Sequence, residues 1–475
     1  MPLVPPSPAV QQRPLRGLER AQLAFGGACY ADLIVAEIEG TVALDALVDA
    51  AHALATRHAV LRSSLPADMG DPVRVAATVE VLPVVFTGEP WLRAAERLLA
   101  EPLMGPSWRL VCALGPPGAA RFHLLLAVHH ALLDGRSLSI LLADLLKALD
   151  HVEQAAEGPA LGAPAAAGRA AADLLPRWMT PLAPLLRAGW RASLGRGGVL
   201  LDAAPLAADA NIPTLFAALD IPEGPMSALC AAARAQGASV GGALASAAWA
   251  ATVALSSRRG TPRRRAQRVP VEAMVDLRRY LPEAAATSAE QVGMYAGGVL
   301  ALPASLDEPD AWERARFAMQ RTRQQLKWSL PLLPHLMFDG LRDPAAWLAA
   351  SGTDLGRHGG AAAVTHVSNV GPWALSARVG SRRILGVWSA AGAIRTGPAL
   401  LLWLRTVEGR GCLSAVANGL VVSRGQLERF LEDAAAELDA MGRARPARPR
   451  LQAHEGGQRG AAAPGGAAAP IRARG

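Results

Sequence analysis

One strand, turn and helix in succession constrain the fold of this chain more than any other feature. Residues 121–129 are a predicted strand, because a run of apolar residues leads into two histidines. Successive strand residues point to opposite faces, so His130 shares a face with Phe122, Leu124, Leu126 and Val128. His129 points to the other face, and a turn then opens a helix predicted over residues 138–149. The two adjacent histidines therefore cannot do the same job.

A histidine at a strand end, with an acidic residue four positions on, is suited to general base catalysis. Asp134 stands four residues after His130, and the pair Asp134-Gly135 is typical of a turn. A neutral imidazole, with an ordinary pKa of about 6.5, accepts a proton at physiological pH and returns it to a leaving group. The structural alternative is that the two histidines only pack against their neighbours. Taken alone, these residues leave both interpretations open.

The run from His129 to Gly135, His-His-Ala-Leu-Leu-Asp-Gly, resembles the His-His-x-x-x-Asp-Gly signature of the coenzyme A-dependent acyltransferase superfamily. That superfamily includes chloramphenicol acetyltransferases, peptide-synthetase condensation domains, polyketide-associated acyltransferases and wax ester synthases. Weaker resemblances to the same superfamily occur on both sides of this motif. They lie in the expected order at residues 38–47, 57–62, 275–281, 292–295 and 368–372. The late Asp-Phe-Gly-Trp block of plant-type members is absent. The resemblance therefore points to bacterial condensation-like or wax-synthase-like relatives.

This resemblance implies an acyltransferase with His130 as its general base. The base would take the proton of an acceptor alcohol or amine, which then attacks a thioester carbonyl directly in a ternary complex. Ser368, Asn369 or a backbone amide is expected to donate a hydrogen bond to the developing oxyanion. The donor would be acyl-CoA or an acyl-carrier thioester, as a co-substrate, with no permanently bound cofactor and no metal. An ester product is expected rather than an amide, in lipid or secondary metabolism.

The other motif residues are expected to be structural at the active site. The resemblance implies that Asp134 pairs with an arginine, and Arg278 is the candidate. His129 would support the local structure. Gly135 would allow a tight turn where the loop meets the second lobe.

The resemblance also implies an α/β fold of two chloramphenicol-acetyltransferase-like lobes, each with α+β layers, and a channel between them. A length of 475 residues suits two lobes of roughly 200 residues each. Loosened Ala-, Pro- and Gly-rich stretches mark the expected connections. The predicted parts are a disordered N-terminus (1–14), an N-terminal lobe (15–152), a crossover linker (153–211), a C-terminal lobe (212–441) and a disordered basic tail (442–475).

Two alternatives in other functional classes stay open. Residues 237–241 match Gly-x-Ser-x-Gly, so Ser239 is a candidate nucleophile of a serine hydrolase or esterase. That motif requires a strand directly before it, whereas residues 226–234 favour a helix. Ser239 is better suited to cap the helix that follows. The other alternative is a non-catalytic condensation-like module that binds a carrier protein.

Charge and cysteine usage limit the partners and the compartment. The formal net charge is +8, but no aromatic residues interleave with the basic clusters, so nucleic-acid binding is not expected. A basic rim would instead suit the phosphates of coenzyme A or an acidic acyl carrier protein. Four cysteines, Cys29, Cys112, Cys230 and Cys412, lie far apart, which indicates a reduced, cytoplasmic protein.

One stretch is long enough to span a membrane. Residues 235–257 carry no charge, but they are rich in Ala, Gly and Ser and poor in large aliphatic side chains. We therefore predict a buried interior helix and no transmembrane span, while peripheral contact with a membrane stays open.

Overall fold

The computed structural model describes residues 11–66, 71–115, 120–156, 158–162, 168–175, 177–194, 212–261, 269–281, 290–303, 310–344, 346–347, 365–373, 376–394 and 398–444. The predicted tail beyond residue 444 and the first ten residues lie outside these ranges. So does much of the predicted crossover linker. Residues 1–444 form one compact unit.

Two apolar strands, β2 (Ala31–Glu39) and β7 (Arg121–His129), lie at the centre of the first sheet and pair along their whole length. They are antiparallel, with Ala31 opposite His129. Most of their residues are buried on both faces, which is why each reads as an almost continuous apolar run. The six strands described in this sheet, in spatial order, are β12 (Arg378–Val379), β13 (Arg382–Ala391), β2 (Ala31–Glu39), β7 (Arg121–His129), β6 (Trp108–Leu114) and β5 (Val84–Thr87).

The second sheet is mixed and, in the described part of the chain, also has six strands. In spatial order they are β10 (Ala296–Leu302), β9 (Val271–Asp276), β11 (Thr365–Pro372), β14 (Leu400–Val407), β15 (Arg410–Asn418) and β8 (Thr214–Ile221). A small third sheet contains β1 (Gln11–Arg13), β4 (Val73–Val75) and β3 (Ser63–Ser64). The two large sheets confirm the predicted α/β class with two lobes.

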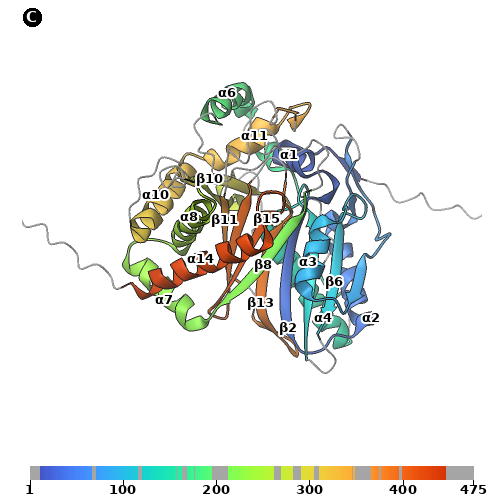
Figure 1. Cartoon of the computed structure of the whole chain (residues 1–475). Helices are drawn as coiled ribbons and strands as arrows, with labels where there is room; N and C mark the ends of the chain where they lie inside the picture. Colours follow the sequence, from blue (N-terminus) through green and yellow to red (C-terminus); the bar gives the residue numbers. More distant parts are fainter. Residues whose placement is uncertain are drawn as a thin grey trace, which may run out of the picture. The chain divides into compact units, whose positions relative to one another are not determined.

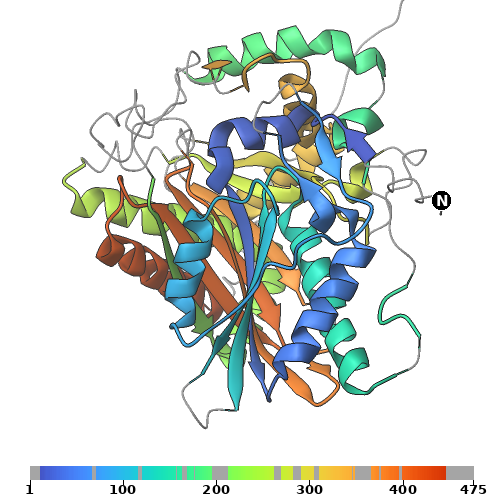
Figure 2. The same ribbon diagram turned by 90° about the vertical axis from the view of Figure 1, so that its right-hand side faces the viewer.

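The helices lie against both large sheets (Figures 1 and 2). The α-helices are α1 (Gly17–Gly26), α2 (Leu44–Arg57), α3 (Trp91–Ala100), α4 (Gly135–Glu153), α5 (Ala171–Leu174), α6 (Ala183–Leu194), α7 (Glu223–Ala235), α8 (Val240–Arg258), α10 (Ala311–Lys327), α11 (Leu333–Phe338) and α14 (Arg424–Arg443). The 3₁₀ helices are η1 (Gly27–Cys29), η2 (Ala59–Arg62), η3 (Arg177–Leu182), η4 (Arg278–Tyr280) and η6 (Leu330–Leu332).

The first sheet combines four described strands from the N-terminal part of the chain with β12 and β13 from its C-terminal part. β13 pairs with β2, although it comes from the stretch that we assigned to the C-terminal lobe. It also contacts the second sheet, where Val387 N donates to Cys412 Sγ at 3.3 Å and Ser414 Oγ donates to the Ser389 carbonyl at 2.7 Å. This crossing covers an edge of β2 that would otherwise be unpaired. The spatial lobes therefore do not follow the predicted sequence boundaries at residues 378–391.

The N-terminal stretch also differs from the prediction. We expected residues 1–14 to be disordered, but Gln11–Arg13 form β1, which pairs antiparallel with β4. Arg13 is held further by an ion pair with Glu19 at 2.8 Å. Disorder is therefore the wrong prediction for these three residues. The Pro-rich composition did not reveal the partner strand.

Helix α8 occupies the stretch that we tested for a membrane span. By length and composition alone it qualifies as a candidate, but 67% of its most apolar window is buried within the protein. It packs between α10 and α14 and against β11, as Figure 1 shows. This agrees with the predicted interior helix.

Candidate active site

The two histidines of the motif follow the end of β7 and enter different surroundings. The backbone N–H of His130 donates to the Tyr30 carbonyl at 2.7 Å, which continues the pairing of β7 with β2 by one residue. His129 is fully buried, whereas the side chain of His130 is 14% exposed. The alternation of strand side chains separates them, as predicted.

Both ring nitrogens of His129 are occupied by backbone groups. Its Nε2 lies 2.8 Å from the Gly27 carbonyl, and its Nδ1 lies 3.1 Å from the N–H of Ala131. Nε2 must carry the proton, because a carbonyl only accepts a hydrogen bond. Burial lowers the pKa of His129 to about 4, so the ring is neutral at physiological pH. His129 therefore fixes the turn and has no nitrogen left for chemistry.

His130 has the opposite arrangement. Its Nδ1 lies 2.9 Å from the Leu133 carbonyl and must carry the proton to make that hydrogen bond. The neutral ring then has its lone pair on Nε2, for which no partner is described among the residues of the structure. Tyr30 packs edge-on against the ring, with centroids 5.0 Å apart. This arrangement leaves the Nε2 lone pair of His130 unpaired among the described residues.

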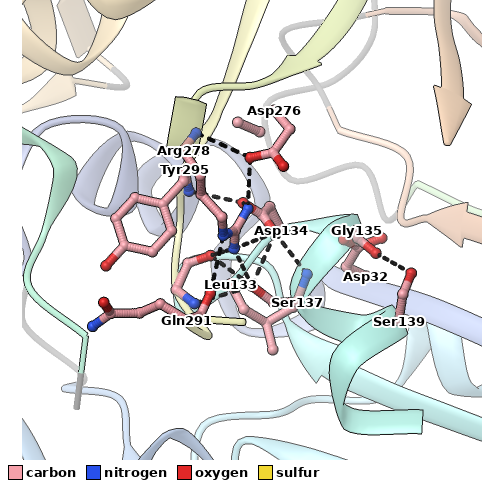
Figure 3. Close-up of polar contacts among 12 residues, drawn as sticks. Asp32, Leu133, Asp134, Gly135, Ser137, Ser139, Asp276, Arg278, Gln291 and Tyr295 are labelled. Atoms are coloured by element: carbon pink, nitrogen blue, oxygen red, sulfur yellow. Dashed lines mark hydrogen bonds and ion pairs between the residues drawn. The ribbon is translucent and has the colours of Figure 1, made fainter. Parts of the chain in front are cut away.

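Asp134 lies in a network of polar contacts that joins the two lobes through Arg278 and Tyr295 (Figure 3). Its carboxylate pairs with Arg278, with Nη1 at 3.0 Å and Nη2 at 3.2 Å. It also accepts from the backbone N–H of Ser137 at 2.8 Å, which caps α4, and from the N–H of Tyr295 at 2.8 Å. The structure thus contains the pair between Asp134 and Arg278 that the sequence analysis predicted.

The network compensates the burial of this carboxylate. Asp134 is 2% exposed and Arg278 is 5% exposed. Burial alone raises the pKa of Asp134, but Arg278 and the backbone donors outweigh burial and hold that pKa below its usual value. Asp276 adds a second carboxylate to Arg278 at 2.8 Å. Asp134 is therefore ionised and fully partnered.

Gly135 is not required for the tight turn that we predicted. Its φ is not positive, and it is the first residue of α4. A Cβ at this position would lie 3.8 Å from the carboxylate of Asp32, which is an ordinary van der Waals distance. Neither the backbone conformation nor the space around it therefore requires glycine here.

Asp32 is a site residue that the sequence analysis missed. One of its carboxylate oxygens lies 3.5 Å from Nδ1 of His130, and its side chain is 5% exposed. Burial raises the pKa of Asp32 to about 6, although His130 and Arg405 pull it down in part. It stands in an apolar strand, so only the pairing of β2 with β7 identifies it as a neighbour of His130.

A buried arginine completes the charged groups near the motif. Arg405, on β14, is 2% exposed, and its Nη2 donates to Ser139 Oγ at 2.7 Å. Ser139 in turn donates to the Gly135 carbonyl at 3.0 Å. The guanidinium lies 5.4 Å from the ring centroid of Trp373, just beyond β11, and its Nε has no hydrogen-bond partner among the described residues. Burial lowers the pKa of Arg405 to about 10.

Asn369, one of the two predicted oxyanion donors, contacts its own strand and α8. Its Oδ1 accepts from the N–H of Gly371 at 3.2 Å, and its amide nitrogen lies close to Gly241. Within the described ranges, neither Ser368 nor Asn369 hydrogen-bonds to His130. Their role as oxyanion donors stays a prediction.

Ser239 has the structural role that we favoured. It caps α8, where its Oγ accepts from the N–H of Gly242 at 3.1 Å. The element before it is helix α7, so the strand that a nucleophile elbow requires is missing from this position.

Comparison with solved structures identifies the fold. A trichothecene 15-O-acetyltransferase from Fusarium sporotrichioides is 13% identical, with a TM-score of 0.66 over 94% of this chain and 100% of the other. The polyketide synthase associated protein 5 of Mycobacterium tuberculosis is 17% identical, with a TM-score of 0.63 over 91% and 99%. The first condensation domain of the CDA synthetase is 19% identical, with a TM-score of 0.62 over 92% and 97%.

These likenesses show that the chain has the fold of CoA-dependent acyltransferases and condensation domains. At these identities they establish the fold alone. No protein-family model matches the sequence, and no curated protein matches it significantly.

Proposed function

We propose that this protein is an acyltransferase that moves an acyl group from a CoA or carrier-protein thioester to an alcohol, with His130 as the general base. The observation that carries the proposal is the free Nε2 of His130, opposite an Nδ1 that is held by the Leu133 carbonyl. The fold supports acyl transfer or condensation in general. An amine acceptor is the alternative to an alcohol.

The proposed step is direct transfer in a ternary complex. Nε2 of His130 takes the proton of the acceptor hydroxyl while its oxygen forms a bond to the thioester carbonyl carbon. The C–S bond then breaks, and Nε2 returns the proton to the thiolate. No acyl-enzyme forms, and the step assigns nothing to a metal or a permanently bound cofactor.

Orientation and oxyanion stabilisation supply the rest of the rate, because a positioned base contributes only about 10²–10⁴-fold. We propose that both substrates reach His130 through a channel between the lobes. Ser368 and Asn369 stay candidates for the oxyanion donor, because the hydrogen bond from Gly371 uses the Oδ1 acceptor of Asn369 and not its Nδ2 donor.

The proposed partners follow from charge and from the related folds. A formal charge of +8 suits the phosphates of coenzyme A or an acidic acyl carrier protein. The comparison includes a protein described as associated with a polyketide synthase. We therefore place the reaction in secondary or lipid metabolism, in the cytoplasm.

The test is thiol release by the purified full chain. Acyl-CoA donors of increasing chain length, and the same acyl groups on a carrier protein, are offered with pooled alcohols and amines. Mass spectrometry then identifies the acylated product. We expect His130→Ala to lower the rate about 10²–10⁴-fold.

A surface histidine provides the matched control. His52 is exposed on α2, and no described hydrogen bond or ion pair joins it to the motif, so His52→Ala is expected to keep the wild-type rate. If His130→Ala transferred acyl groups as fast as His52→Ala, His130 would not be the base. Absence of product from every donor and acceptor would count against the proposed function itself.

A further inference from the structure

Asp32 faces the same side of the first sheet as His130. It stands directly opposite Val128 in the pairing of β2 with β7, and opposed residues share a face. His130 follows two residues after Val128, so it is the diagonal neighbour of Asp32. The register of two strands therefore sets the distance of 3.5 Å between the carboxylate and Nδ1.

A buried carboxylate at this position lowers the free energy of unfolding. The next residues of β2, Leu33, Ile34 and Val35, are all fully buried, and an aliphatic side chain would fit the same strand. The groups that act on Asp32 are His130, Asp134, Arg405 and the backbone N–H of Leu33, and Asp32 in turn acts on Tyr30. The like charge of Asp134 opposes its ionisation, and the other three groups offset the burial only in part. Such incompletely compensated burial is typical of functional positions.

We propose that Asp32 is a positioning residue that places a negative charge beside the protonated Nδ1 of His130 and stabilises the imidazolium ion formed during acyl transfer. This inference rests on the proposed function. The Leu133 carbonyl, at 2.9 Å, accepts the Nδ1–H hydrogen bond, and Asp32 supplies negative charge beside it. The transferred proton moves between the acceptor oxygen, Nε2 and the leaving sulfur. Asp32 neither takes nor gives a proton, as in other carboxylate-supported histidine bases.

Arg405 reduces the free-energy cost of burying the ionised Asp32 carboxylate. It is the buried cation that acts on Asp32, and it is anchored to Ser139, next to Gly135. The positive charge partly offsets the carboxylate while leaving it free to act on His130. Arg405 thus joins β14 of the second sheet to the surroundings of the base.

The test compares Asp32→Asn and Asp32→Leu with wild type over a range of pH. Both remove the charge, and leucine suits the apolar strand, so at least one variant is expected to fold with a normal thermal transition. We expect kcat to fall about 10- to 100-fold, with KM changed less than about 2-fold. The acid limb of the pH profile should move to lower pH by about one unit, because the imidazolium loses its negative neighbour.

Glu37 supplies a control on the same strand. It pairs with Arg121 at 3.4 Å near the surface, and Glu37→Gln is expected to leave the rate and the profile unchanged. Wild-type rates and an unmoved acid limb in both Asp32 variants would overturn the proposal.

A second readout separates this inference from the proposed function. The titration of the His130 ring, followed by NMR, needs no substrate. In Asp32→Asn the His130 midpoint should fall by about one pH unit even if the chain transferred no acyl group at all. An unchanged midpoint would reject the contact between Asp32 and His130, whatever the outcome of the activity assay.

Discussion

Two buried carboxylates near the motif have opposite environments. Asp134 accepts hydrogen bonds from Arg278, Ser137 and Tyr295, and its pKa is held below the usual value despite burial. Asp32 is buried to a similar degree, but burial dominates and raises its pKa to about 6. The first carboxylate ties α4 to the second lobe. The second faces His130.

This difference in compensation between Asp134 and Asp32 indicates which carboxylate is available to interact with His130. A fully partnered carboxylate contributes to the fold and has no remaining interaction to offer a reacting group. A poorly compensated one reduces stability and is retained where its charge has another use. The acidic residue of the sequence motif is therefore partnered within the fold, and the carboxylate within 3.5 Å of His130 Nδ1 lies on the neighbouring strand.

The largest expected effect on stability comes from Asp134. Asp134→Asn leaves Arg278 buried with less negative charge, so the free energy of unfolding should fall by about 3–5 kcal/mol at neutral pH. Urea unfolding measures this loss. The double variant Asp134→Leu/Arg278→Met should recover much of it, because it removes both charges. A loss below about 1 kcal/mol would contradict the structural role.

Asp32→Asn should change stability in the opposite direction. A folded-state pKa of about 6, above the unfolded value of about 3.9, means that the ionised carboxylate destabilises the fold above pH 6. This cost shrinks as the pH falls from about 6 to about 4 and is gone below about pH 3, where Asp32 is protonated in both states. We expect the variant to be more stable than wild type by up to about 3 kcal/mol near pH 8, and equal to it below about pH 3. If Asp32→Asn were less stable than wild type at pH 8, the contrast between Asp32 and Asp134 would be wrong.

The smallest effect is expected at Ser239. Ser239→Ala removes the cap of α8 and should cost about 1 kcal/mol of unfolding free energy, with no change in the rate of acyl transfer. Thermal unfolding and thiol release measure the two quantities. Loss of an ester-hydrolysing activity in this variant would instead support a serine hydrolase.

Structural features that depend on neighbouring residues in the chain were predicted correctly from the sequence. The strand ending at His129, the turn and α4 follow from alternation and turn residues, and the cap at Ser239 follows from the sequence around it. The partnership of Asp134 with Arg278 came from the resemblance, because no local pattern links residues so far apart.

Features that depend on distant pairing were missed. Asp32 reads as one polar residue in an apolar strand, and only the register against β7 brings it to His130. The placement of β13 beside β2, and of Arg405 beside Ser139, likewise depends on tertiary packing. The need for glycine at position 135 was overestimated because a glycine after an aspartate suggests a turn, whereas Gly135 begins α4.

The central claim is that Nε2 of His130 is the basic atom of the site. Nitrogen NMR of protein labelled at histidine, near pH 8 and with both motif rings assigned by substitution, tests it most directly. The account predicts a protonated Nδ1 and an unprotonated Nε2 for His130, and the reverse for His129. A protonated Nε2 on His130 would contradict it.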